Sequence, residues 1–167
     1  MHSDYKVIRL AIETEIDGYR YFNSAAERAV HDRARETWMS LAADEIDHMK
    51  ILQAQLNELG RSEPDEDEGP EEPKDKAVIA PTSAVPDQVN MDDDLAALQI
   101  GLEVEARTRD FYARAAVETE NATMKATYKQ LAAMEDGHYR LVDETYRFLA
   151  DPQGWSFDQV RPIQDGG

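Results

Sequence analysis

The sequence predicts an all-α fold, a four-helix bundle made of two duplicated helical hairpins joined by a long crossover linker. Two long regions of the 167-residue chain carry apolar residues at the spacings of three and four that are typical of helices. These regions flank a segment rich in prolines and carboxylates, and the second repeats the first after a shift of 90 residues. We therefore expect a single domain over residues 1–167, since a chain of this length can bury one substantial core.

The first hairpin is expected over about residues 3–60. Its first helix extends from about Ser3 to Val30, with the core-facing stripe Ile8, Ile12, Glu15, Tyr19, Phe22, Ala26 and Ala29. Its second helix extends from about Arg33 to Leu59, with the stripe Trp38, Leu41, Glu45, His48, Leu52, Leu56 and Leu59. Asp32 is the expected N-cap of the second helix, and Gly60 is the residue expected to end it.

A linker is expected over about residues 61–91. Residues 63–72 hold seven carboxylates and two prolines, and three more prolines follow by residue 86. A helix cannot continue through such a segment, because proline removes a backbone donor and clashes with the preceding turn. A linker of this length can span on the order of 100 Å when fully extended, whereas one helix is roughly 40 Å long. The linker can therefore run the length of the bundle and join two parallel helices.

The second hairpin is expected over about residues 92–150. Its first helix starts near Asp92–Asp94 and ends near Thr119, with the stripe Leu95, Leu98, Leu102, Glu105, Thr108, Phe111 or Tyr112, Ala115 and Ala116. Asn121 is the expected N-cap of the last helix, whose stripe is Met124, Tyr128, Leu131, Glu135, His138, Val142, Thr145 or Tyr146, and Leu149. Asp151 and Pro152 end it. The tail, residues 151–167, carries Trp155 and Phe157 and is expected to fold back on the bundle.

The repeat aligns the halves without gaps, and the identities gather around acidic and histidine positions in the apolar stripes. The aligned pairs are Glu15 with Glu105, Glu45 with Glu135, and His48 with His138. Each half has the same plan, a Glu followed 30 residues later by Glu-x-x-His. Because residues three apart share one face of a helix, each Glu-x-x-His can direct a carboxylate and an imidazole at one ion. The alternative for a single Glu-x-x-His is an ordinary surface pair, but the repeated arrangement favours a site.

The six aligned residues predict a metal centre of two divalent cations. Each Glu stands where a core-facing apolar residue is expected, and buried carboxylates need compensation of several kcal/mol. The Lys and Arg residues sit mostly at outward positions. Four-helix carboxylate proteins hold two metal ions with this donor set. The predicted ligands are Glu15, Glu45, His48, Glu105, Glu135 and His138.

Other polar residues are placed outside this centre. Glu13 and Glu103 are also aligned by the repeat, but each lies about 200° around its helix from the candidate ligand and is expected to face solvent. His2 and His31 have no aligned partner and are expected at the surface. Tyr112, seven residues after Glu105, could hydrogen-bond a ligand carboxylate or serve as a core aromatic.

Composition excludes several classes of protein. Acidic residues outnumber basic ones by 35 to 18, so the net charge of −17 disfavours nucleic acid and anionic membranes as partners. The absence of cysteine excludes disulfides, thiolate metal sites and thiol nucleophiles from these residues. Without an apolar run that resembles a signal peptide or a membrane span, we expect a cytoplasmic protein.

Additional apolar positions lie off the stripes and predict a homodimer interface: Met39, Ile46, Ile16 and Tyr139.

The motifs themselves resemble a known family. They are Ala11-Ile12-x2-Glu15-x5-Tyr21-Phe22-x2-Ala25-Ala26 with Leu41-Ala42-x2-Glu45-x2-His48, and Leu102-x2-Glu105-x5-Phe111-Tyr112-x2-Ala115-Ala116 with Leu131-Ala132-x2-Glu135-x2-His138. This pattern resembles the rubrerythrin-like (erythrin) branch of the ferritin-like di-iron carboxylate superfamily. The resemblance covers both hairpins but not the linker.

The resemblance implies a ferritin-like bundle with a di-iron centre that reacts with hydrogen peroxide or dioxygen. In this hypothesis Glu15 and Glu105 are terminal ligands, and Glu45 and Glu135 bridge the ions. The same ligands also accept manganese or a mixed pair of metals. The expected activity is that of a di-iron oxidoreductase of peroxidase or ferroxidase type, supplied with electrons by an external donor protein.

Two departures from the rubrerythrin pattern favour alternatives to a rubrerythrin-like peroxidase. No cysteine-rich rubredoxin domain is present in the sequence, and Thr108 stands where rubrerythrins have a further Glu ligand. The first alternative is a ferroxidase or iron-binding protein that sequesters iron without steady-state turnover. The second is a bundle with an interaction role whose site holds no functional metal.

Overall fold

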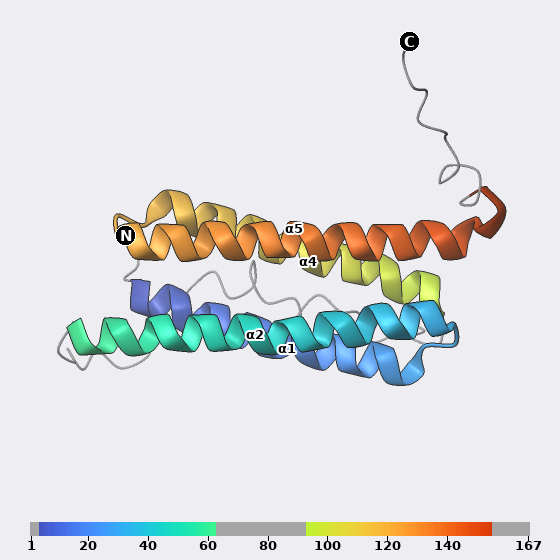
Figure 1. Cartoon of the computed structure of the whole chain (residues 1–167), viewed down its shortest axis with the longest axis horizontal. Coiled ribbons are helices and arrows are strands. Elements are labelled where there is room, and N and C mark those ends of the chain that lie inside the picture. The colour runs from blue at the N-terminus through green and yellow to red at the C-terminus, as the bar shows by residue number, and fades with distance from the viewer. Residues whose placement is uncertain (1–3, 63–92, 155–167) are drawn as a thin grey trace, which may run out of the picture.

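The computed structural model describes residues 4–62 and 93–154, which form four long helices arranged as two hairpins (Figure 1). The first hairpin consists of α1 (Asp4–Arg28) and α2 (Asp32–Ser62), and the second of α4 (Asp94–Glu118) and α5 (Ala122–Ala150). No strand occurs in this described part of the chain. The all-α bundle predicted from the sequence is therefore confirmed. The expected docking of Trp155 and Phe157 concerns residues that lie outside the described ranges.

Contacts at the two ends of the bundle define its topology. At one end the Asp94 carboxylate accepts the backbone N–H groups of Val30 and His31, at 3.2 and 2.7 Å. At the other end the Thr119 hydroxyl donates to the Asp4 carboxylate at 2.9 Å. Helices α1 and α4 are therefore antiparallel, and α2 and α4 run in the same direction (Figure 1). The end of α2 and the start of α4 consequently lie at opposite ends of the bundle, the arrangement that requires a long crossover connection.

The ends of α2 differ from the sequence prediction. His31, rather than Asp32, caps the helix, because its Nδ1 accepts the backbone N–H of Arg33 at 3.1 Å. Asp32 is instead the first helical residue and pairs with Arg35 at 2.8 Å. Gly60 does not end α2, which continues to Ser62. Glycine ends a helix efficiently when it adopts a left-handed conformation, and no described glycine has a positive φ.

The second hairpin begins both of its helices with side-chain caps. The Asp93 carboxylate accepts the backbone N–H groups of Leu95 and Ala96, and the Asn121 side chain accepts those that open α5, as its position predicts. Such caps each contribute about 1 kcal/mol, because they satisfy helix donors that have no partner within the helix. Asp151 follows the last residue of α5, as predicted.

The buried apolar side chains form two clusters, one toward each end of the bundle. Cluster 1 includes Phe22, Trp38, Leu41, Leu98 and Val142. Cluster 2 includes the residues related to them by the 90-residue shift, Tyr112, Tyr128, Leu131, Ile8 and Leu52. The exchange of equivalent residues between the clusters indicates a pseudo-twofold axis between the hairpins, which passes through the region that separates the clusters.

The apolar residues predicted to form a dimer interface lie partly outside the core. Met39 is 60% exposed and Ile46 is 39% exposed, seven residues apart on α2. Ile16 and Tyr139 are half-buried. Dimer formation itself stays a prediction.

Candidate metal centre

Between the two apolar clusters, each of the four helices places one carboxylate in the core. Glu15 lies on α1, Glu45 on α2, Glu105 on α4 and Glu135 on α5, and each is at most 3% exposed. One turn after the Glu residues of α2 and α5 lie two histidines: His48 is fully buried, and His138 is 7% exposed. The helical periodicity that buries the neighbouring apolar residues therefore also buries these six polar ones.

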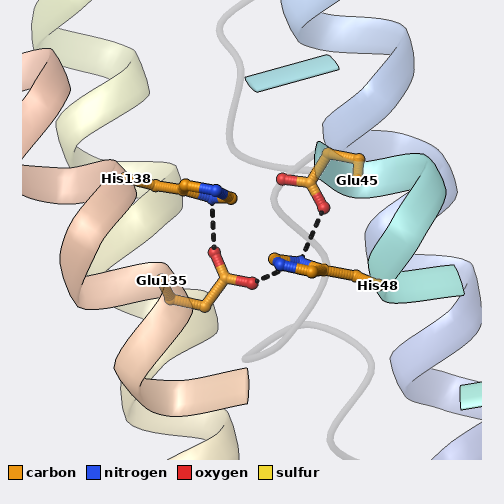
Figure 2. Close-up of side chains that lie close together, drawn as sticks. All are labelled: Glu45, His48, Glu135 and His138. Atoms are coloured by element: carbon orange, nitrogen blue, oxygen red, sulfur yellow. Dashed lines mark ion pairs between the residues drawn. The ribbon is translucent and has the colours of Figure 1, made fainter. Parts of the chain in front are cut away.

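The two Glu-x-x-His pairs face each other across the bundle (Figure 2). Nδ1 of His48 lies 3.4 Å from a Glu45 oxygen on its own helix and 2.9 Å from Oε1 of Glu135 on α5. The other Glu135 oxygen lies 3.4 Å from Nδ1 of His138. One ligand atom from each of these four residues can be chosen so that all lie within 4.8 Å of one another. Glu135 therefore stands between the two imidazoles.

The two remaining carboxylates approach the same ring nitrogens. Oε2 of Glu15 is 3.3 Å from Nδ1 of His48, and Oε2 of Glu105 is 3.7 Å from Nδ1 of His138. Each half of the cluster thus contains the Glu of one helix and the Glu-x-x-His of the adjacent helix. All six residues predicted as ligands from the sequence come together in one buried cluster.

This cluster fits cations better than it fits a protein core. Within the described residues, the four carboxylates have ion-pair contacts shorter than 4.0 Å only with the two imidazoles. Several buried atoms lack a well-directed hydrogen bond: Glu45 Oε2, Glu105 Oε1, both Glu135 carboxylate oxygens, His48 Nε2 and His138 Nδ1. Buried polar atoms without partners are costly, and carboxylate oxygens with imidazole nitrogens are ligands for divalent iron and manganese.

Protons take the place of cations when no metal is bound. Burial, followed by repulsion from Glu15, raises the pKa of Glu45 well above its usual range, and burial with repulsion from Glu135 does the same for Glu105. Burial lowers the pKa of His138, but hydrogen bonds to Glu105 and Glu135 outweigh it and raise the pKa to about 10. The carboxylates around His48 likewise raise its pKa despite burial.

Glu135 behaves differently from Glu45 and Glu105. Burial raises the pKa of Glu135, but its contacts with His138 and His48 outweigh burial and lower the pKa to about 2. It therefore keeps its charge to a lower pH than Glu45 and Glu105 do.

Tyr112 contacts the cluster directly. Its hydroxyl is buried and donates a short hydrogen bond to Oε1 of Glu15. Burial, then repulsion from Glu15, raises the pKa of Tyr112 well above its usual range, so the hydroxyl stays a donor. Its counterpart Phe22 cannot donate, so the two halves of the cluster are not identical in this respect.

Thr108 stands where the resemblance noted in the sequence implies a further Glu ligand. It is buried, and its hydroxyl donates to the backbone carbonyl of Val104 at 3.1 Å. The residue related to it by the repeat is Gly18, next to Glu45: a Cβ at Gly18 would lie 3.5 Å from the Glu45 carboxyl group. Neither residue therefore adds a carboxylate to the cluster.

Residues predicted to lie outside the centre do so where the structure describes them. Glu13 and Glu103 are exposed, and Glu103 pairs with Arg107 on its own helix at 3.4 Å. His31 is exposed and caps α2, whereas His2 lies outside the described residues.

Asp44, which was not predicted from the sequence, also lies at the centre. Oδ2 of Asp44 lies 3.3 Å from Nε2 of His138, the ring nitrogen that faces away from the carboxylates. Asp44 precedes Glu45, but the repeat places Met134 at the equivalent position, so the repeat did not select it.

One of three comparisons with known proteins finds a match. The family model described as Rubrerythrin matches residues 6–146. Comparisons with curated proteins and with solved structures find no match. Among the described residues, no helix is long and apolar enough to cross a membrane.

Proposed function

This chain belongs to the rubrerythrin family, and we propose that it is a non-haem di-iron redox protein that reacts with hydrogen peroxide or dioxygen. The observation that carries this proposal is the buried cluster of carboxylates and imidazoles contributed by all four helices. Two ferrous ions held there would supply two electrons and Lewis acidity for the reduction of an O–O bond.

The residues of the cluster suit two adjacent ions. Glu15 and His48 would hold one ion, and Glu105 and His138 the other, because these residues pair at 3.3 and 3.7 Å in the two halves. Glu135 has one oxygen toward each imidazole, at 2.9 and 3.4 Å, which supports a shared role, and the repeat suggests the same for Glu45. Iron is proposed over manganese from the family, since both metals accept these ligands.

The surroundings of the cluster would control the reaction. The apolar clusters on both sides keep bulk water from the carboxylates, which strengthens every charge interaction in the site. Tyr112 holds one oxygen of Glu15, and His48 Nδ1 lies 3.3 Å from the other. The orientation of this carboxylate is therefore determined before any metal binds.

A second function, ferroxidation or sequestration of iron without steady-state turnover, is supported by the chemistry of the chain. No cysteine occurs in these 167 residues, so they contain no thiolate-bound iron that could deliver electrons. Thr108 also leaves the ligand set symmetric rather than expanded by another Glu. Repeated turnover would therefore depend on a separate electron donor.

One experiment distinguishes these functions. The metal-free protein is titrated anaerobically with Fe²⁺, the bound ions are counted, and hydrogen peroxide or dioxygen is then added in separate samples. Rapid oxidation of about two irons per chain, renewed by a chemical reductant, is expected for the redox enzyme. Oxidation that occurs once per loading, or binding of many more ions, would favour iron storage.

The matched variants are Glu45→Ala, in the cluster, and Asp47→Ala, on the same helix but exposed and paired with Lys50 at 2.7 Å. Glu45→Ala should lose stoichiometric binding, whereas Asp47→Ala should retain it. Equal binding by Glu45→Ala and wild type would exclude the cluster as the metal site.

A further inference from the structure

The repeat gives the two imidazoles similar inner surroundings but different outer ones. On the inner side, Nδ1 of each ring faces carboxylates of the cluster. On the outer side, Nε2 of His138 lies 3.3 Å from the carboxylate of Asp44, whereas Nε2 of His48 is buried without a hydrogen-bond partner. The residue 90 positions after Asp44 is Met134, whose thioether is at best a weak acceptor.

A carboxylate on the outer nitrogen changes what the inner nitrogen can do. When Nε2 carries the proton and donates it to Asp44, the lone pair of Nδ1 is directed toward the cluster. Such an outer carboxylate fixes the tautomer and the orientation of the ring, and it strengthens the ring nitrogen as a ligand. Among the described residues, Nε2 of His48 has no equivalent partner, so its ring is oriented by its Nδ1 contacts and by packing. The two imidazole rings stack with centroids 5.1 Å apart.

We propose that Asp44 is a positioning residue that makes the His138 half of the cluster the tighter of two unequal cation positions. The inference rests on the proposed function, because it concerns how the same cluster holds metal. Asp44 suits this role because it comes from α2 and reaches the imidazole of α5, joining the two hairpins at the centre. Its side chain is 48% exposed, so its substitution leaves no buried cavity.

The test is an anaerobic titration with Co²⁺, which reports ligand geometry through its visible absorption and is not oxidised under these conditions. Wild-type protein should bind two Co²⁺ ions in two resolved steps. Asp44→Ala should weaken the tighter step by about 10–100-fold and change the spectrum of the first equivalent, leaving the other step unchanged. Asp44→Asn retains an acceptor oxygen and should recover most of the lost affinity.

Three controls separate positioning from a general loss of charge or stability. Asp47→Ala removes an exposed carboxylate from the same helix and should leave both steps unchanged. In a His138→Gln background, Asp44→Ala should have no further effect on Co²⁺ affinity, since the residue then has no imidazole to orient. Thermal unfolding of the metal-free Asp44 variants should differ little from that of wild type, because a half-exposed ion pair contributes little to stability.

The outcomes distinguish this inference from the proposed function. If wild type binds no Co²⁺, both are overturned. If wild type binds two ions and Asp44→Ala binds them equally well, or loses both steps to the same extent, the role of Asp44 is overturned and the metal centre stands. A loss in Asp47→Ala equal to that in Asp44→Ala would also overturn it, since the effect would then be one of surface charge.

Discussion

Metal binding at this cluster should release protons even at alkaline pH. The perturbation is the addition of two Co²⁺ ions per chain to the metal-free protein at pH 8. An imidazole with the ordinary pKa of about 6.5 is about 3% protonated at this pH and would release almost nothing. His138, with its pKa raised to about 10, is about 99% protonated at pH 8, and the pKa of His48 is raised as well.

The expected release at pH 8 is therefore about two protons from the imidazoles, because a metal can bind Nδ1 only after its proton leaves. Glu45 and Glu105, whose pKa values burial raises, add to this release wherever they are protonated. The affinity for metal must consequently rise with pH. Where two protons leave with two ions, the product of the two binding constants rises about 100-fold per pH unit.

The release is measured with a pH-indicator dye in weakly buffered anaerobic solution, or by calorimetry in two buffers of different ionisation enthalpy. Asp47→Asn should behave as wild type, because that exposed carboxylate pairs with Lys50. Release of clearly less than one proton for two bound Co²⁺ ions at pH 8 would refute the argument that protons compensate the buried carboxylates.

Three further predictions follow from the same structure. The free energy of unfolding of the metal-free protein should fall by a few kcal/mol between pH 7 and 10. The pKa of His138 is about 10 in the folded protein and about 6.5 in the unfolded chain, so its protonation stabilises the fold, and this stabilisation is lost as the pH rises toward 10. Thermal unfolding across this range measures it, and an increase with pH would contradict the assignment. Tyr112→Phe removes the buried hydrogen bond to Glu15 and should destabilise the metal-free protein by about 1–3 kcal/mol in urea unfolding. The control Tyr146→Phe removes an exposed hydroxyl bonded to Gln99 and should change the free energy of unfolding little. Equal effects of the two substitutions would argue against the Glu15 contact. Gly101→Ala should lower the free energy of unfolding by about 1–2 kcal/mol net, because a Cβ there would lie 2.5 Å from Cη2 of Trp38. Gly137→Ala should raise it by about 0.5–1 kcal/mol through helix propensity, because nothing lies within 4 Å of the added Cβ. A stabilising Gly101→Ala would show that the indole can move aside.

Much of the fold was determined by local pattern. Helical periodicity predicted the four helices, and Asn121 marked the start of α5, because caps and amphipathic stripes depend on neighbouring residues alone. The errors were local as well. His31 took the capping position expected for Asp32, and α2 passed through Gly60, because glycine only weakens a helix.

The sequence by itself also determined which residues meet at the centre, because a repeat with a fixed spacing must place equivalent side chains about one axis. The six candidate ligands and the exposed positions of Glu13 and Glu103 could therefore be named without a structure. What only the tertiary structure decided is how the two halves differ. Tyr112 reaches Glu15 on α1, and Asp44 reaches His138 on α5, and both contacts cross from one hairpin to the other. A repeat predicts what two halves share, whereas contacts between residues that have no counterpart in the other half depend on how the hairpins pack.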